Sequence, residues 1–160
     1  MGSIIRRLEH HIFQFISWLA QLLLWVAVAA GFYQVLSRFV LQSPAAWSEA
    51  LTRSSIIWVV MLGIALAFRE GSMLGVDALR NKLNEYGYGR ILEHLVLLIV
   101  AAFLIFLLWI GINMTWRVRF QTMPTLGVSI SWVYASIPTG AALSLLAVFS
   151  HWGRNFLHKE

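Results

Sequence analysis

Four long stretches of the chain contain no Asp, Glu, Lys, Arg or His, and together they cover most of its length. They run over residues 12–37, 54–68, 95–116 and 120–150. A hydrocarbon core about 30 Å thick needs roughly 20 helical residues, so the first and third stretches are long enough to cross a membrane. Arg53 and Arg69 bound the shorter second stretch, but both side chains can reach the interface from within a longer helix. The pattern therefore predicts four transmembrane helices.

The last of these stretches is too long for one span and contains Pro124 and Pro138. Its first part is predicted to be a loop, and Pro138 is expected to bend the helix that follows because it removes a backbone hydrogen bond. Ser43 and Pro44 predict the N-cap and first turn of the second helix. The predicted fold class is all-α integral membrane, with one four-helix domain over residues 1–160 and spans at about 12–37, 47–68, 93–116 and 131–152.

A further helix is predicted between the second and third spans, over about residues 72–86. Apolar residues recur there at helical spacings, while polar residues that include Asp77 and Arg80 occupy the other faces. The apolar set consists of Met73, Val76, Leu79, Leu83 and Tyr86. This pattern is typical of an amphipathic helix that lies on the membrane surface, and we expect it on the inner surface.

Composition and charge agree with a membrane location and indicate an orientation. Apolar residues make up 59% of the chain, and the absence of cysteine excludes disulfides and thiolate metal sites. The net charge of +5 reports orientation rather than nucleic-acid binding, because cytoplasmic loops collect Lys and Arg. Four spans place both termini on one side, and eight of the twelve cationic residues then lie on that side. We therefore expect both termini in the cytoplasm. The eight are Arg6, Arg7, Arg69, Arg80, Lys82, Arg90, Arg154 and Lys159.

Two sets of residues predict helix contacts within the membrane. Gln14, Ser17 and Gln21 are spaced three and four residues apart, so they share one helix face, which we expect to contact other helices rather than lipid. In the fourth span, a stripe of small residues repeats every four positions and allows another helix to approach closely. The stripe consists of Ser136, Gly140 and Ser144.

Glu49 and Arg53 lie four residues apart near the outer end of the second span, close enough to pair. Two interpretations stay open for this pair. In a packed interface its attraction would matter, whereas a solvated pair contributes only a few tenths of a kcal/mol.

No ionisable side chain is predicted at membrane depth, where an ion-coupled carrier normally keeps one. Small multidrug-resistance exporters are similar in length and span number, but they need a glutamate within the first helix, and none follows Glu9 there. Phosphate-binding loops of the GxxxxGK[ST] or GxGxxG type are absent, and no plausible Ser, His and acid set lies on adjoining elements. We therefore expect a non-enzymatic scaffold or partner subunit.

Histidine leaves one alternative open. Five histidines fall on the cytoplasmic side of the predicted topology, and two histidines can ligate a haem iron. The alternative function is therefore the four-helix membrane anchor of a respiratory complex with a b-type haem. His94 and His151 sit at predicted helix ends rather than inside spans, which favours interfacial, solvated side chains. The five are His10, His11, His94, His151 and His158.

Several short motifs carry a family resemblance that covers nearly the whole chain. Their residues are Ser37-Arg38-Phe39, Trp47-Ser48-Glu49, Arg53, Trp58, Gly63, the run from Gly71 to Asp77, Pro124-Thr125-Leu126, Tyr134 and Ile137-Pro138. The chain resembles the small membrane subunit, of the DctQ type, of tripartite ATP-independent periplasmic (TRAP) transporters. It departs from the family pattern at Ala50, where a second acidic residue is frequent, and at Met73, where a histidine is frequent.

The resemblance implies a complex in the bacterial inner membrane. A periplasmic substrate-binding protein would deliver an organic anion to a large permease subunit, which would bind substrate and sodium and move as an elevator. The small subunit would serve as a rigid scaffold among membrane lipids and would hold no cofactor of its own. The solute, such as a carboxylate or sialic acid, is not specified by this chain.

All candidate site residues are therefore expected to be structural or interfacial, and none is assigned to catalysis, substrate or metal. Trp47, Glu49 and Arg53, with Arg38 as a neighbour, would anchor the outer end of the second helix. Trp58 and Gly63 belong to the same motif further along that helix. The remaining residues fall on the inner surface helix (Asp77 and Arg80) and on the seam of the fourth span (Ser136, Pro138, Gly140 and Ser144).

Overall fold

The computed structural model describes residues 2–70 and 89–157, and this part of the chain is almost entirely helical. Four of its helices are long and apolar enough to cross a membrane, which confirms the predicted number of spans. The predicted surface helix over residues 72–86, with Asp77 and Arg80, lies outside the described residues. The helices are α1 (Gly2–Phe39), α2 (Ala46–Arg69), α4 (Gly89–Arg117), α5 (Ser131–Tyr134) and α6 (Ser136–Leu157).

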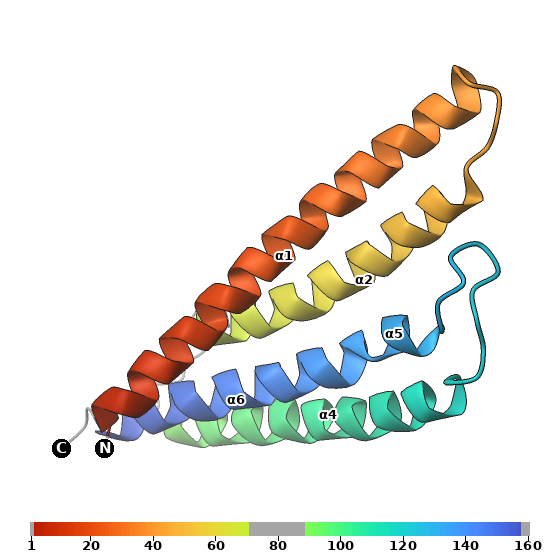
Figure 1. Cartoon of the computed structure of the whole chain (residues 1–160). Helices are drawn as coiled ribbons and strands as arrows, with labels where there is room; N and C mark the ends of the chain where they lie inside the picture. Colours follow the sequence, from red (N-terminus) through yellow and green to blue (C-terminus); the bar gives the residue numbers. More distant parts are fainter. Residues whose placement is uncertain (1, 71–88, 158–160) are drawn as a thin grey trace.

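The helices form a row rather than a closed bundle. Within the described residues α1 packs along α2, α2 along α6, and α6 along α4 (Figure 1). The start of α1 and the end of α6 lie at the same end of the helices, as an even number of spans requires. The loops after α1 and α4 lie at the opposite end of the helices. Because α1 and α4 are the two edges, each packs along a single long helix and leaves a broad lateral surface.

A small apolar core joins the first three helices of the row. Phe13, Ile16 and Ala20 of α1 pack with Leu62 of α2 and Ala147 of α6. Most other large apolar side chains are exposed, including those along the edge helix α4. In a protein with helices of this length and hydropathy, such surfaces face lipid or another membrane subunit.

The start of α2 differs from the prediction that Ser43 is its N-cap. The helix begins at Ala46, and its N-cap residue, Ala45, has no side chain that could accept a capping hydrogen bond. The loop is instead held by Ser37 of α1, whose buried hydroxyl accepts from the Ala45 N–H at 3.4 Å and donates to the Gln34 carbonyl at 3.0 Å. The Ser43 N–H donates to the Ser37 carbonyl at 3.0 Å. Anchoring to the end of α1 therefore replaces a local cap.

Candidate functional site

The small-residue stripe of α6 lies at a close seam with α2. Ser136, Gly140 and Ser144 are all buried. A Cβ added to Gly140 would lie 2.8 Å from Met61 Cβ and 2.9 Å from the Met61 carbonyl oxygen, so the two backbones approach this closely only because Gly140 has no side chain. The Ser144 hydroxyl donates to the Gly140 carbonyl at 2.8 Å, and the Ser136 hydroxyl donates to Val133 at 2.6 Å. Both hydroxyls are thus satisfied within their own segment.

A second close contact joins α4 to α6 at Gly111. A Cβ added there would lie 2.8 Å from Pro138 Cδ and 3.0 Å from Pro138 N. Sequence analysis did not identify Gly111, although it is the only glycine in the uncharged stretch 95–116. A lone glycine in such a stretch is a weak signal of a helix contact, because its neighbour is unknown until the helices are placed. Pro138 therefore contacts a neighbouring helix as well as shaping its own.

The last span is interrupted at Ala135, where sequence analysis predicted a single bent helix. Pro138 lies in the first turn of α6, where its missing N–H costs little, but it cannot donate to the Tyr134 carbonyl as a continuous helix would require. The carbonyl of Trp132, just before the break, accepts a hydrogen bond from Trp58 Nε1 of α2 at 3.1 Å. The indole of Trp58 therefore replaces a helical donor and ties α2 to α5.

The charged pair Glu49 and Arg53, near the start of α2, is exposed. Arg53 Nη2 lies 2.5 Å from Glu49 Oε1, and the two side chains are 76% and 48% exposed. No ion pair joins Arg38 to Glu49 within the described ranges, and the guanidinium of Arg38 lies 6.0 Å from the ring of Phe39. The interpretation in which Glu49 and Arg53 lie in a packed interface therefore requires a partner subunit that covers them.

Trp47 stacks against α1 at the same end of the molecule. Its ring centroid lies 5.3 Å from that of Tyr33 at an interplanar angle of 35°, an arrangement that stabilises a pair of aromatic side chains. A shallow pocket beside this pair brings the loop after α1 together with Thr125 of the loop after α4. The two loops thus lie close together at the end of the molecule opposite the start of α1.

At the end of the molecule where α1 begins, Arg69 ties the last turn of α2 to α1. Its guanidinium carbon lies 4.8 Å from the centroid of the Phe13 ring, and Arg69 Nη2 lies 3.2 Å from His10 Nδ1. Since a guanidinium has no acceptor, the ring nitrogen accepts this hydrogen bond.

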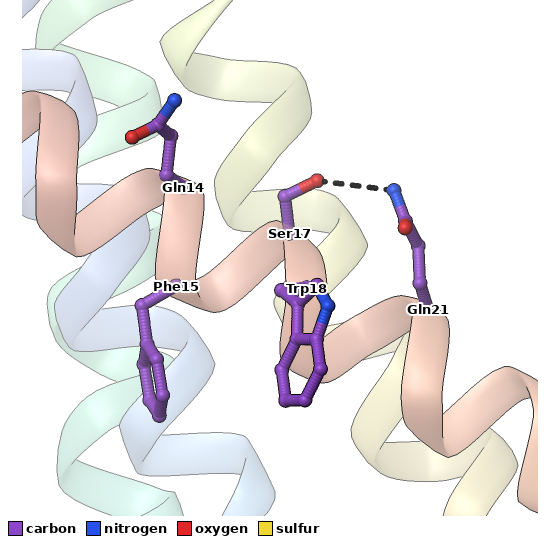
Figure 2. A pocket seen from close by; sticks show the side chains of 5 residues that line it. All are labelled: Gln14, Phe15, Ser17, Trp18 and Gln21. Carbon is purple, nitrogen blue, oxygen red and sulfur yellow. Dashed lines mark hydrogen bonds between the residues drawn. The ribbon is translucent and has the colours of Figure 1, made fainter.

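Gln14, Ser17 and Gln21 form what we call the polar strip of α1. Figure 2 shows their side chains on one side of α1, with Phe15 and Trp18 projecting from another. They share a face, as predicted, but among residues 2–70 and 89–157 the face does not pack on another helix: Gln14 and Gln21 are exposed, and the strip lines an open pocket with the two aromatic residues.

Gly63 of α2 has open space around it. No side chain or backbone atom of the described residues lies within 4 Å of a Cβ added there. Packing among the described residues therefore explains a glycine at position 140 but not at position 63.

The polar groups of the described segments do not converge on a reaction centre. These segments contain no group of three or more His, Cys, Asp or Glu side chains able to hold a metal ion. Their polar contacts instead close loops and fix helix ends, and their closest contacts are seams between helices. The four long apolar helices define a multi-pass membrane protein.

The chain belongs to the DctQ family, the family of small permease components of TRAP transporters. Residues 27–158 match the family model described as "Tripartite ATP-independent periplasmic transporters, DctQ component". The match covers all of α2, α4, α5 and α6, and of α1 only its last third, residues 27–39. Family membership identifies the chain as a transporter component and not an enzyme, and the haem-anchor alternative finds no support in it.

Three curated proteins illustrate this relationship. The small permease protein SiaQ of a sialic acid TRAP transporter from Vibrio cholerae is 30% identical over 111 residues, which are 68% of this chain and 62% of that protein. The sialic acid TRAP transporter permease protein SiaT from Haemophilus influenzae is 30% identical over 123 residues, 77% of this chain but 20% of that protein. A putative TRAP transporter small permease protein from Haemophilus influenzae is 23% identical over 150 residues, covering 93% and 90%.

Proposed function

We propose that this protein is the small scaffold subunit of a sodium-coupled TRAP transporter that imports an organic anion. A large elevator-type permease subunit would bind the substrate and sodium, and a periplasmic binding protein would deliver the substrate. The small subunit would hold the large one in place in the bacterial inner membrane, with both of its own termini in the cytoplasm. Sialic acid is the first candidate solute, because two relatives are described as parts of sialic acid transporters.

One observation carries the scaffold role. Residues 12–37, 54–68, 95–116 and 131–150 of the four spans contain no Asp, Glu, Lys, Arg or His. Coupling to an ion gradient normally depends on ionisable side chains or unwound helices that face a cavity at membrane depth. The described spans are interrupted once, at Ala135. The nearby carbonyl of Trp132 already accepts a hydrogen bond from Trp58 Nε1, so it is not free to bind an ion. A gradient-driven step is therefore assigned to the partner.

The close seams suit a rigid scaffold. Gly140 against Met61 and Gly111 against Pro138 bring neighbouring backbones to distances that leave no room for a methyl group. Contacts of this kind resist sliding of one helix past another, because any shift replaces a glycine with a side chain. A subunit that supports a moving partner needs this resistance.

Reconstitution tests the proposal. The small subunit alone, the large permease subunit alone, and both together are placed in proteoliposomes with the binding protein outside and an inward sodium gradient. Labelled sialic acid is the first probe, followed by C4-dicarboxylates and sugar acids. We expect uptake only with both membrane subunits present. Uptake by the small subunit alone, or equal uptake by the large subunit without it, would contradict the scaffold assignment.

A further inference from the structure

The polar strip of α1 faces away from the chain's own core. The buried residues of α1 near this level, Phe13 and Ile16, pack in the core with α2 and α6. Within the strip, Gln21 Nε2 donates to Ser17 Oγ over a long 3.5 Å, and Gln14 has no hydrogen-bond partner among the described residues. Amide groups therefore remain available on a lateral surface of an edge helix.

The strip lies within the candidate membrane span of α1, Glu9–Phe39. Arg69, the last residue of α2, lies over the ring of Phe13 of α1. Gln21 lies eight residues beyond Phe13, which is about 12 Å along a helix axis. At that depth lipid offers no hydrogen-bonding group, and an amide without a partner is costly. The strip is therefore suited to form hydrogen bonds with a polar side chain of another membrane helix.

We propose that the polar strip, with Phe15 and Trp18 beside it, binds a transmembrane helix of the large permease subunit that presents a hydroxyl or amide side chain. The inference rests on the proposed function and names the surface through which it acts. Phe15 and Trp18 are 63% and 64% exposed, so they supply apolar contact area around the hydrogen-bonding groups.

The relatives favour this occupant. The segment of Haemophilus influenzae SiaT that matches this chain is only 20% of that protein, so in that relative the matching segment is part of a much larger permease polypeptide. A larger polypeptide that shares the membrane with this row is the partner most available to an edge helix. A second copy of this chain is the competing occupant, and the test below distinguishes the two.

Photo-crosslinking tests the surface directly. Benzoylphenylalanine is placed at position 21 of the small subunit, which is co-expressed with the large permease subunit, and the membranes are irradiated. The matched control carries it at position 98, where Leu98 is 69% exposed on the opposite edge helix α4. We expect an adduct of the small and large subunits from position 21 and none from position 98.

The other outcomes count against the inference. An adduct of two small subunits, at twice 18.2 kDa, would show that a second copy occupies the strip. If the unaltered subunits co-purify but position 21 gives no protein adduct, the proposed function stands and this surface is wrong. If the unaltered subunits do not co-purify, the proposed function itself fails.

A substitution provides an independent measurement. Gln21→Leu should lower the amount of large subunit retained on the tagged small subunit by about threefold or more, the effect of losing one hydrogen bond between membrane helices. Asn113→Leu makes a similar change on α4, where the amide donates to the Trp109 carbonyl of its own helix, and should leave retention unchanged. The isolated Gln21→Leu subunit should unfold at the unaltered temperature. Equal retention by Gln21→Leu and the unaltered subunit would overturn the proposal.

Discussion

Gly140→Ala tests whether the seam between α2 and α6 holds the fold together. The added methyl carbon would lie 2.8 Å from Met61 Cβ, 2.9 Å from the Met61 oxygen and 3.2 Å from its carbonyl carbon. Ordinary contacts between carbon atoms lie at about 3.5–4.0 Å. Two of the three nearest atoms belong to backbone, so no side-chain rotation relieves the clash, and the helices must separate by roughly 1 Å.

The expected cost follows from two opposing effects. Overpacking a closely packed site typically costs about 1–3 kcal/mol. Replacing glycine by alanine inside a helix contributes about 0.5–1 kcal/mol of stability in the other direction. The net loss in free energy of unfolding should therefore be roughly 1–2 kcal/mol. Separation of α2 from α6 would also weaken their shared core around Leu62 and Ala147.

The assay is the unfolding of the purified subunit in detergent as SDS is added. Tryptophan fluorescence and circular dichroism monitor the unfolding. Gly63→Ala is the matched control, because the described residues leave nothing within 4 Å of its added methyl group. It should retain or slightly gain stability. Equal midpoints for Gly140→Ala and Gly63→Ala would refute the claim that close backbone approach at Gly140 stabilises the row.

Three further changes have defined consequences in the same unfolding assay. Trp58→Phe keeps the ring but leaves the Trp132 carbonyl without its donor, so we expect a loss of about 1–3 kcal/mol; an unchanged midpoint would show that the break does not need this bond. Ser37→Ala removes the hydroxyl that holds the loop before α2 and should cost about 1 kcal/mol, whereas no loss would mean that the loop is fixed elsewhere. Glu49→Gln should change the isolated subunit by no more than about 0.5 kcal/mol because the pair with Arg53 is exposed, and a larger loss would contradict the solvated interpretation.

The spans were predictable because charged residues are expelled from the hydrocarbon region whatever the tertiary structure. The stripe of Ser136, Gly140 and Ser144 was visible for a similar reason, since its period is set by one helix alone. The partners of such residues were not predictable. Gly111 opposite Pro138 is a relation between two helices, and nothing in either segment specifies the other.

The incorrect N-cap and the direction of the polar strip have a common physical origin. Ser43 was assigned from local sequence, but the hydroxyl of Ser37, six residues earlier, holds the loop instead. The strip of α1 was correctly placed on one face, but which neighbour it meets depends on the order of helices in the row. Local propensity determines where helices form, and long-range packing decides what each face contacts.

The polar groups that lie in the seam between helices of this subunit differ from those that we propose bind a partner. In the seam, the hydroxyls of Ser136 and Ser144 donate to carbonyls of their own segment. These two side chains therefore let α2 approach closely because they are small, and their hydroxyls need no donor or acceptor from α2. On the edge helix, Gln21 has only a long bond to Ser17. An edge with polar groups left to satisfy selects a partner that can complete them. The exposed side chains of α4 are mostly apolar, and its exposed amide, Asn113, donates to the Trp109 carbonyl of its own helix. The two edge helices therefore differ in the hydrogen-bonding groups that they leave exposed. We expect a partner subunit to bind α1 rather than α4.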